Sequence, residues 1–342
     1  MRTPMPAATL GRSPNSLGSW AVVVASVALG VEGWRALSAA PGGAWHAMVQ
    51  QGTVLVGPAV LALVILVVVL ERLWPAERRP IGARGHRQDA AYLVLYVVAA
   101  VPAVTLIGTG ASSLLQRLDG GATVHPFAGL PRWALVVAVL VLMDLANWAS
   151  HLLNHRVGSF WRYHALHHAQ EELSILTAFR AHPLVHTSFQ LAAVPLIVLG
   201  TGGAVPGWAL VGYVLASTLP HANVNWRLGP LAYVVVTPAY HRLHHDRADR
   251  RGVNLGTVLV IWDVLAGLAV FPEKGSAPVP TGLAGRPVPV EQDDAATAGW
   301  ALTMGRQLWS PVAGVPRPAT APERGAVPAR RGSLVLSGAS SG

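Results

Sequence analysis

Residues 143–168 read MDLANWASHLLNHRVGSFWRYHALHH, and this stretch decides both the fold class and the kind of site. It joins the end of an apolar run, residues 133–147, to an HxxxH motif at His151 and His155 and to an HxxHH motif at residues 164–168. Spacings of three and four residues place imidazoles on one face of a helix. Because the first pair continues the apolar run without a break, we expect it to emerge at a membrane surface.

Histidines recur beyond this stretch, and eleven of the fourteen lie between residues 151 and 245. The first HxxHH motif contains His164, His167 and His168, and a second HxxHH motif contains His241, His244 and His245. Three further histidines lie between the two motifs: His182, His186 and His221. Each HxxHH motif can place three imidazoles on one metal, or two on one metal and the third on its neighbour. One ion takes about three to six ligands. Since the HxxxH and two HxxHH motifs supply eight imidazoles, the pattern predicts two metal ions.

The chain has no cysteine, which excludes disulfides, iron–sulfur clusters, cysteine-ligated haem and zinc–thiolate sites. Imidazole binds zinc, copper, iron and nickel, so the ligand type alone does not choose the metal. A structural zinc site closes with four ligands, fewer than the histidines present here. A pair of redox-active, non-haem iron ions is therefore the simpler hypothesis.

The composition indicates a membrane protein, because 52% of the residues are hydrophobic and only 12% are charged, against about 25% charged in soluble domains. Four apolar runs, at residues 17–31, 53–70, 90–108 and 133–147, approach the roughly 20 residues that span a bilayer. Two shorter runs, 191–199 and 208–219, flank a Gly/Pro turn and predict a membrane hairpin. We expect an all-α integral membrane protein with about four transmembrane helices, this hairpin, and a cytosolic histidine-rich helical cap. The first run can alternatively be a signal peptide.

The positions of the arginines predict the orientation. The segment between the second and third runs is the most basic of the connections: Arg72, Arg78, Arg79, Arg84 and Arg87. The positive-inside rule places this segment, and hence the histidine motifs, on the cytoplasmic side. We expect a multi-pass protein of a bacterial inner membrane. Since no basic helical face emerges, the net charge of +9 does not indicate a nucleic-acid partner.

Three regions follow from composition. We expect residues 1–16 to be a loose N-terminal leader and residues 17–274 to be a membrane-embedded domain, which a family resemblance further implies to be catalytic, with a histidine core at 144–271. Residues 275–342 are rich in Pro, Gly, Ala and Arg, so we expect them to be largely disordered.

Five stretches resemble the fatty acid hydroxylase and sterol desaturase superfamily, which includes alkylglycerol monooxygenase-like enzymes. They are MDLANWASHLLNH (143–155), FWRYHALHHAQEE (160–172), FRAHP (179–183), LPHANVNWRLGPL (219–231) and VTPAYHRLHHDRADRRGVNLGTVLVIWD (236–263). The resemblance implies a membrane-embedded helical fold whose cytosolic cap holds two iron ions. It also implies nine ligands: His151, His155, His164, His167, His168, His221, His241, His244 and His245. His182 and His186 are less certain members of this set.

Metal-bound histidines usually donate their second N–H to a carboxylate or a carbonyl oxygen. We expect the partners among Asp144, Glu171, Asp246 and Asp263, with Asn254 as a further polar candidate. Asp144 has the greatest weight, because an ionisable side chain near the end of an apolar span is costly unless it is paired or functional. No catalytic residue apart from the ligands is predicted.

The family resemblance implies an oxidoreductase that uses O2 and external electrons to hydroxylate or desaturate an aliphatic C–H bond of a lipid. The chain shows no fused donor domain, so a ferredoxin or a cytochrome b5-type protein is the expected electron donor. A histidine-rich membrane protein that binds or transports metal is an alternative, although transporters place their ligands near the bilayer midplane. A catalytically inactive, lipid-binding relative is a further alternative.

Overall fold

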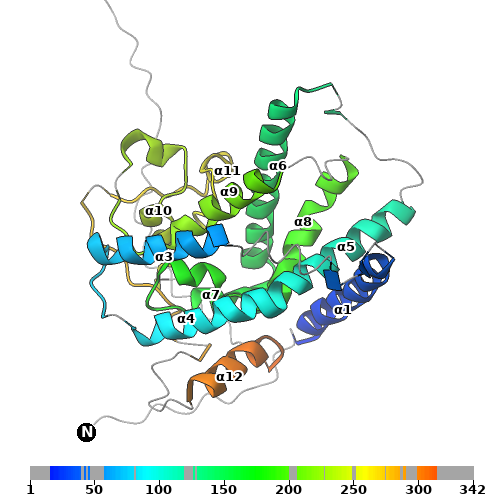
Figure 1. Cartoon of the computed structure of the whole chain (residues 1–342). Helices are drawn as coiled ribbons and strands as arrows, with labels where there is room; N and C mark the ends of the chain where they lie inside the picture. The colour runs from blue at the N-terminus through cyan, green and yellow to red at the C-terminus, as the bar shows by residue number, and fades with distance from the viewer. Residues whose placement is uncertain are drawn as a thin grey trace, which may run out of the picture.

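The computed structural model is helical, and the part of the chain that it describes contains no β-strand beyond three isolated bridges (Figure 1). The described residues are 16–39, 42–43, 45–46, 58–80, 82–118, 126–127, 129–199, 206–226, 228–248, 252–273, 275–285, 288–289 and 299–313. The expected leader lies outside them except for residue 16. The prediction of an all-α fold is confirmed.

Within the described residues, three helices are long and apolar enough to cross a membrane. They are α1 (Ser16–Ser38), α6 (Arg132–Arg156), and a continuous helix made of α4 (Arg84–Leu95), η1 (Tyr96–Ala100) and α5 (Val101–Leu118). Only 22–28% of the most apolar window of each is buried inside the protein. Their remaining apolar side chains are therefore available to lipid. These helices confirm the first, third and fourth apolar runs as helices.

The other apolar runs form shorter helices. The run at 53–70 is described from residue 58, as α3 (Pro58–Leu73). The hairpin limbs are α8 (His186–Val198) and α9 (Gly207–Thr218), and the turn at 200–205 lies outside the described residues. Helix α8 begins five residues before the predicted limb, because its first turn is the polar sequence HTS rather than an apolar one.

Helices α1 and α5 lie side by side (Figure 1), and two glycines set their distance. A Cβ atom added to Gly33 would lie 1.9 Å from the Leu106 carbonyl oxygen, and one added to Gly110 would lie 1.9 Å from the Leu29 carbonyl oxygen. Small residues at a membrane helix crossing allow the backbones this close approach. The α1–α5 pair therefore tolerates no side chain at either glycine.

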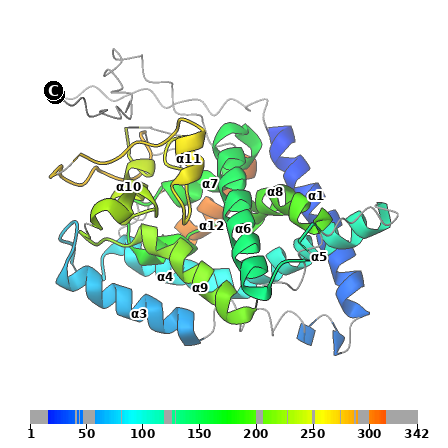
Figure 2. The ribbon, with the colours of Figure 1, turned by 90° about the horizontal axis from the view of Figure 1, so that it is seen from above.

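The histidine-bearing helices gather where α6 ends. Val157, in an extended conformation, ends α6 and precedes α7 (Gly158–His168). Helix α10 (Pro238–His244) begins at a cap in which the Thr237 hydroxyl accepts the Tyr240 N–H, and the short η4 (Leu219–His221) follows α9. Figure 2 shows α10 and α11 (Ile261–Leu265) on the side of the molecule away from α1 and α5. Connecting 3-10 turns are η2 (Ile175–Phe179), η3 (Pro183–Val185) and η5 (Gly229–Tyr233).

The C-terminal segment contains a helix. Residues predicted to be disordered include α12 (Gly299–Ala313), whose Met304 and Leu308 pack on a core formed by α4 and α7 with Leu283 and Val288. Gln307 is fully buried and donates to the Pro289 carbonyl oxygen at 2.7 Å. Composition alone missed this helix because its apolar residues are spread among Pro and Gly. Residues 314–342 lie outside the described part.

Candidate metal centre

The nine histidines that the family resemblance singled out converge into two groups. In each group the candidate ligand nitrogens all lie within 4.8 Å of one another. The first group, called here the five-histidine group, contains His151, His155, His164, His168 and His244. The second, the four-histidine group, contains His167, His221, His241 and His245. The two groups adjoin, because the rings of His168 and His245 stack at 4.4 Å between centroids.

Each HxxHH motif contributes to both groups. In the first motif, His164 and His168 point into the five-histidine group and His167 into the four-histidine group. In the second motif the division is reversed, since His244 joins the five-histidine group and the other two join the four-histidine group. Of the two arrangements that the spacing allows, the structure shows two imidazoles on one group and the third on its neighbour.

The ring nitrogens within a group are spaced for a shared ion. The Nε2 atoms of His151 and His164 are 3.1 Å apart, as are those of His167 and His221. Two nitrogens that are each about 2.1 Å from one ion and about 3.1 Å apart subtend about 95° at it, whereas a tetrahedral ion would separate them by about 3.4 Å. The spacing therefore suits an ion with more than four ligands.

The pair His167 and His221 gives a sharper test of whether the histidines fit a cation. Their Nδ1 atoms lie 3.3 Å from the carbonyl oxygens of Arg180 and Thr218. A carbonyl only accepts, so each neutral ring carries its proton on Nδ1 and a lone pair on Nε2. Two lone pairs facing each other at 3.1 Å repel unless one ring is protonated or a cation lies between them.

Protonation is disfavoured at this position. Burial, followed by the charges of neighbouring histidines, lowers the pKa of His167 well below its usual value. Burial also lowers the pKa of His221 to about 4. The same causes lower the pKa values of His164, His168, His241, His244 and His245. Near neutral pH these rings are uncharged and offer lone pairs, so the donor set fits metal cations.

Orphaned ring nitrogens support this conclusion. Among the described residues, Nε2 of His244 and both ring nitrogens of His155 are buried without a hydrogen-bond partner. A buried polar atom without a partner is costly, and metal binding would satisfy His244 Nε2 and one of the two nitrogens of His155.

Carbonyl oxygens, and not carboxylates, orient the rings whose outer nitrogen is hydrogen-bonded. His151 Nδ1 lies 2.8 Å from the Leu255 carbonyl oxygen, and His244 Nδ1 lies 2.9 Å from that of Val253. Together with Arg180 and Thr218, these backbone groups take the place that the sequence assigned to acidic side chains. Since every residue has a carbonyl, no residue type in the sequence could have revealed them.

The two best acidic candidates, Asp263 and Asp144, bind the backbone near the histidines. Asp263 accepts hydrogen bonds from Trp148 Nε1, the Tyr240 hydroxyl, and the N–H groups of Leu255 and Gly256, at 2.8–3.0 Å. It thereby fixes the carbonyl that holds His151. Asp144 accepts from Trp262 Nε1 at 2.8 Å and from the N–H groups of Val258 and Leu259 at 3.1 Å. Both carboxylates tie the loop after residue 253 to α6.

Asn254 lies between the two orienting carbonyls. It is the one non-glycine residue of the described chain with a positive φ, at 54°. Its side chain donates to the carbonyl oxygens of Tyr240 and Val270 and accepts the Val270 N–H at 2.7 Å. This turn lets Val253 and Leu255 both direct their carbonyls to histidines of the five-histidine group.

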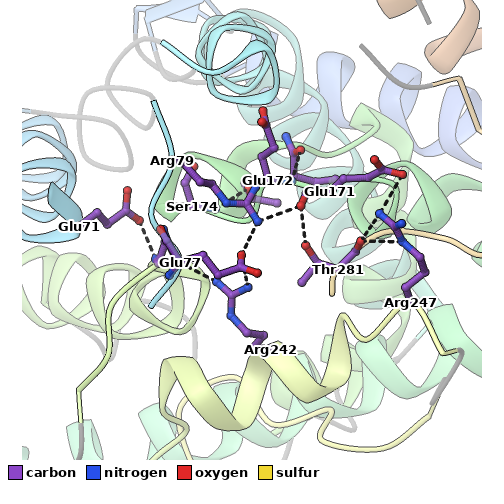
Figure 3. Close-up of polar contacts among 12 residues, drawn as sticks. Glu71, Glu77, Arg79, Glu171, Glu172, Ser174, Arg242, Arg247 and Thr281 are labelled. Carbon is purple, nitrogen blue, oxygen red and sulfur yellow. Dashed lines mark hydrogen bonds and ion pairs between the residues drawn. The ribbon is translucent and has the colours of Figure 1, made fainter. Parts of the chain in front are cut away.

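Glu171 belongs to an outer polar network (Figure 3), and the Asp246 carboxylate accepts the Ala248 N–H at 2.9 Å. Glu171 pairs with Arg247 at 3.0 Å, and its carbonyl accepts from Arg79. Glu77 bridges Arg79 and Arg242, the residue that follows the ligand candidate His241. This network joins the α3–α4 connection to α10, and so it supports the four-histidine group from outside.

His182 and His186 stay outside both groups. His182 caps η3 by accepting the Leu184 N–H at 3.1 Å. His186 packs edge-on against Tyr96, with 6.1 Å between ring centroids. His182 and His186 have the same four-residue spacing as His151 and His155, so spacing alone does not separate these roles from ligation.

A cavity of about 330 Å³ lies against both groups. Its walls come from η1, α5, α6, α8 and α9, and include Val104, Met143, Phe189, Leu210 and Val214. His151 and His164 of the five-histidine group line it, as do His167, His221 and His241 of the four-histidine group. The arrangement can hold an apolar chain against the paired histidine groups.

The chain is similar to several known proteins. The family described as fatty acid hydroxylase matches residues 136–268. An ornithine lipid hydroxylase (OlsE) of Rhizobium tropici is 31% identical over 226 residues, which cover 64% of this chain and 67% of that protein. The alkylglycerol monooxygenase of Homo sapiens is 33% identical over 128 residues, 36% of this chain and 28% of that protein.

A very-long-chain aldehyde decarbonylase of Oryza sativa subsp. japonica is 27% identical over 147 residues, 37% of this chain and 23% of that protein. The chain thus spans two thirds of the first relative and less than a third of the other two. No solved structure matches the chain significantly. The family match and the ornithine lipid hydroxylase together place the chain in the fatty acid hydroxylase family.

Proposed function

We propose that the chain is a membrane-bound lipid hydroxylase whose two histidine groups hold two iron ions. The observation that carries the proposal is the sharing of each HxxHH motif between adjoining groups. That arrangement couples two ions closely, which neither a structural zinc site nor a transport site requires. Family membership, and the lipid hydroxylase and monooxygenase among the relatives, favour redox chemistry on a lipid.

In the proposed reaction, an aliphatic C–H bond, O2, two electrons and two protons give an alcohol and water. When bound, the two irons supply the reduction of O2 and the oxidising power for C–H cleavage. The chain's own residues position the lipid and exclude water. The apolar walls of the cavity hold the alkyl chain against His164 and His167, and proximity of this kind accounts for much of the rate. Desaturation would use the same reactants and release a second water.

The cellular setting is also part of the proposal. Residues 17–274 form the catalytic unit, and the arginines at residues 72–87 support a cytoplasmic position of the histidines at a bacterial inner membrane. The two electrons come from a separate protein of the ferredoxin or cytochrome b5 type.

Metal analysis of the detergent-purified protein tests the proposal. After enrichment with iron-57, we expect about two irons per chain, and Mössbauer spectra of a magnetically coupled pair. His164→Ala and His244→Ala should lose the coupling, whereas His182→Ala, which removes a histidine outside both groups, should keep it. Hydroxylated lipid should then accumulate in a strain that expresses the wild type and not in one that expresses His164→Ala.

A protein that keeps zinc after reconstitution with Fe(II), or that holds no coupled iron pair, would contradict the iron assignment. Coupled iron with no change in the lipids of the expressing strain would instead contradict the hydroxylase assignment.

A further inference from the structure

Apart from the two histidine groups, three polar atoms of the described cavity wall are buried without a hydrogen-bond partner: Asn154 Oδ1, His186 Nε2 and Thr257 Oγ1. Asn154 is only 6% exposed. Other polar residues of the wall are satisfied within the protein, as Ser150 is by Ser188 and Ser217 by the Val214 carbonyl oxygen. Because buried polar groups are nearly always paired, three unpaired atoms in a single cavity indicate a ligand that pairs with them.

The backbone at Tyr96 supports a binding role. Tyr96 begins the π-helical turn η1, which interrupts the long helix from Arg84 to Leu118. Turns of this kind occur frequently at functional sites. The turn places the Tyr96 ring edge-on against Phe179, at 5.4 Å between centroids, and against His186 on α8. A π-helical turn and an unpaired histidine from separate helices thus meet in one part of the wall.

The chemistry of these groups restricts the ligand. Tyrosine and threonine hydroxyls, an amide and a neutral imidazole all both donate and accept hydrogen bonds. The residues known to line the cavity include no Arg, Lys, Asp or Glu. An ionised phosphate, carboxylate or ammonium would therefore lack a counter-charge, which makes its burial costly. The complementary ligand group is uncharged and can both donate and accept.

We propose that Tyr96, Asn154, His186 and Thr257 form a subsite for a hydroxyl or a secondary amide group of the lipid. This inference rests on the proposed function and narrows its substrate class to lipids that carry such a group near the oxidised carbon. The cavity, at about 330 Å³, is at the small end of ligand pockets, which span about 300–1,000 Å³. Since the subsite and both histidine groups line this one cavity, the reacting C–H bond lies within a few bonds of the polar group.

Competitive binding tests the subsite without turnover. Dodecan-1-ol and its methyl ether, 1-methoxydodecane, share an alkyl chain, but the ether has no hydrogen-bond donor. Native mass spectrometry of the detergent-solubilised protein with both ligands counts each bound species by its mass. We expect the ratio of bound alcohol to bound ether to be about three- to tenfold higher in the wild type than in Tyr96→Phe or His186→Phe. This is the change in affinity that the loss of one hydrogen bond predicts.

The comparison between proteins cancels the unequal partitioning of the two ligands into the detergent. Val104→Ala is the matched control, because it changes an apolar part of the same wall and should weaken both ligands equally. Circular dichroism and metal content verify that the variants fold. An equal ratio in the wild type and in both variants would overturn the subsite, and so would binding of neither ligand.

A turnover arm separates the subsite from the proposed function. With O2 and a chemical reductant, the iron-loaded enzyme should oxidise dodecan-1-ol at carbons near its hydroxyl group. Oxidation mainly at the distal methyl end would overturn the inferred placement while leaving the hydroxylase proposal intact. Retained preference for the alcohol with no oxidised product would support the subsite and count against the hydroxylase.

Discussion

His151 donates its Nδ1–H to the carbonyl oxygen of Leu255 at 2.8 Å, and this bond directs Nε2 of the ring toward His164. The carbonyl is in turn fixed by Asp263, which accepts the Leu255 N–H at 3.0 Å and the Gly256 N–H at 2.8 Å. A carboxylate thus positions the ring of His151 through the backbone. Such outer partners set the orientation of metal ligands and their affinity.

Asp263→Asn should weaken metal binding in the five-histidine group. An amide offers one accepting oxygen where the carboxylate offers two, so it cannot accept from Trp148, Tyr240, Leu255 and Gly256 together. Loss of an outer partner typically costs about 10–100-fold in metal affinity. The measurement is iron retained per chain during a chelator titration, in which we expect one of two irons to become labile.

Thr187→Val is the control for this experiment, because it removes a buried hydrogen bond, that of Thr187 with Ser26, in a part of the molecule without histidine ligands. Its iron retention should match the wild type. Equal retention in Asp263→Asn and the wild type would show that Asp263 does not position His151.

Substitutions at Asn254 should separate its backbone role from its side-chain role. Asn254→Gly loses the hydrogen bonds to Tyr240 and Val270 but adopts the positive φ freely. Asn254→Ala loses the same bonds and adds strain of about 1–2 kcal/mol. We therefore expect the free energy of unfolding, measured by denaturant unfolding in detergent, to be highest for the wild type, lower for the Gly variant and lowest for the Ala variant. If the free energy of unfolding of the Ala variant equals or exceeds that of the Gly variant, backbone strain does not affect stability at this position.

The groups of histidines were predictable because their geometry is local. Spacings of three and four residues fix which imidazoles share a helical face, so the motifs at 164–168 and 241–245 are enough to indicate two ions. The family resemblance added His221, which no motif contains. The division of each motif between groups depends on how α7 and α10 face each other, which spacing leaves open.

The parts that sequence could not supply depend on tertiary contacts. The orienting carbonyls of Val253 and Leu255 have no residue-type signature. His186 belongs to the cavity wall because α8 places its ring against Tyr96 of η1. Helix α12 is fixed by Gln307, whose side-chain Oε1 accepts the Tyr92 hydroxyl at 2.7 Å. Composition indicated only a Pro- and Gly-rich tail around Gln307, because the number of residues of each type carries no information on which side chains are buried.

Glu77→Gln should destabilise the protein in a pH-dependent way. Although burial raises the pKa of Glu77, Arg242 and Arg79 outweigh burial and leave that pKa below 4.5. A lowered pKa means that the carboxylate stabilises the folded state above about pH 4.5, and that this contribution is lost as pH falls through the lowered value. We expect a loss of about 1–3 kcal/mol at pH 7, and a difference from the wild type that shrinks below pH 4.5.

Thermal unfolding in detergent between pH 3.5 and 7 measures this difference. Glu32→Gln is the matched control, because Glu32 pairs with an Arg117 side chain that is 65% exposed, and such pairs contribute at most about 1 kcal/mol. A Glu77→Gln effect that is independent of pH would assign the stabilisation to packing rather than to charge.

The two histidine groups should differ in how they tolerate the loss of one ligand. His155→Ala leaves four histidines in its group, whereas His245→Ala leaves three. His155 has no hydrogen bond at either ring nitrogen, so its removal orphans no protein partner. His245 stacks on His168 and links the groups. After a fixed chelator challenge we expect His155→Ala to retain nearly two irons per chain and His245→Ala about one. Equal losses in both variants would mean that the ions bind and leave as one unit, so that ligand number in each group does not set affinity.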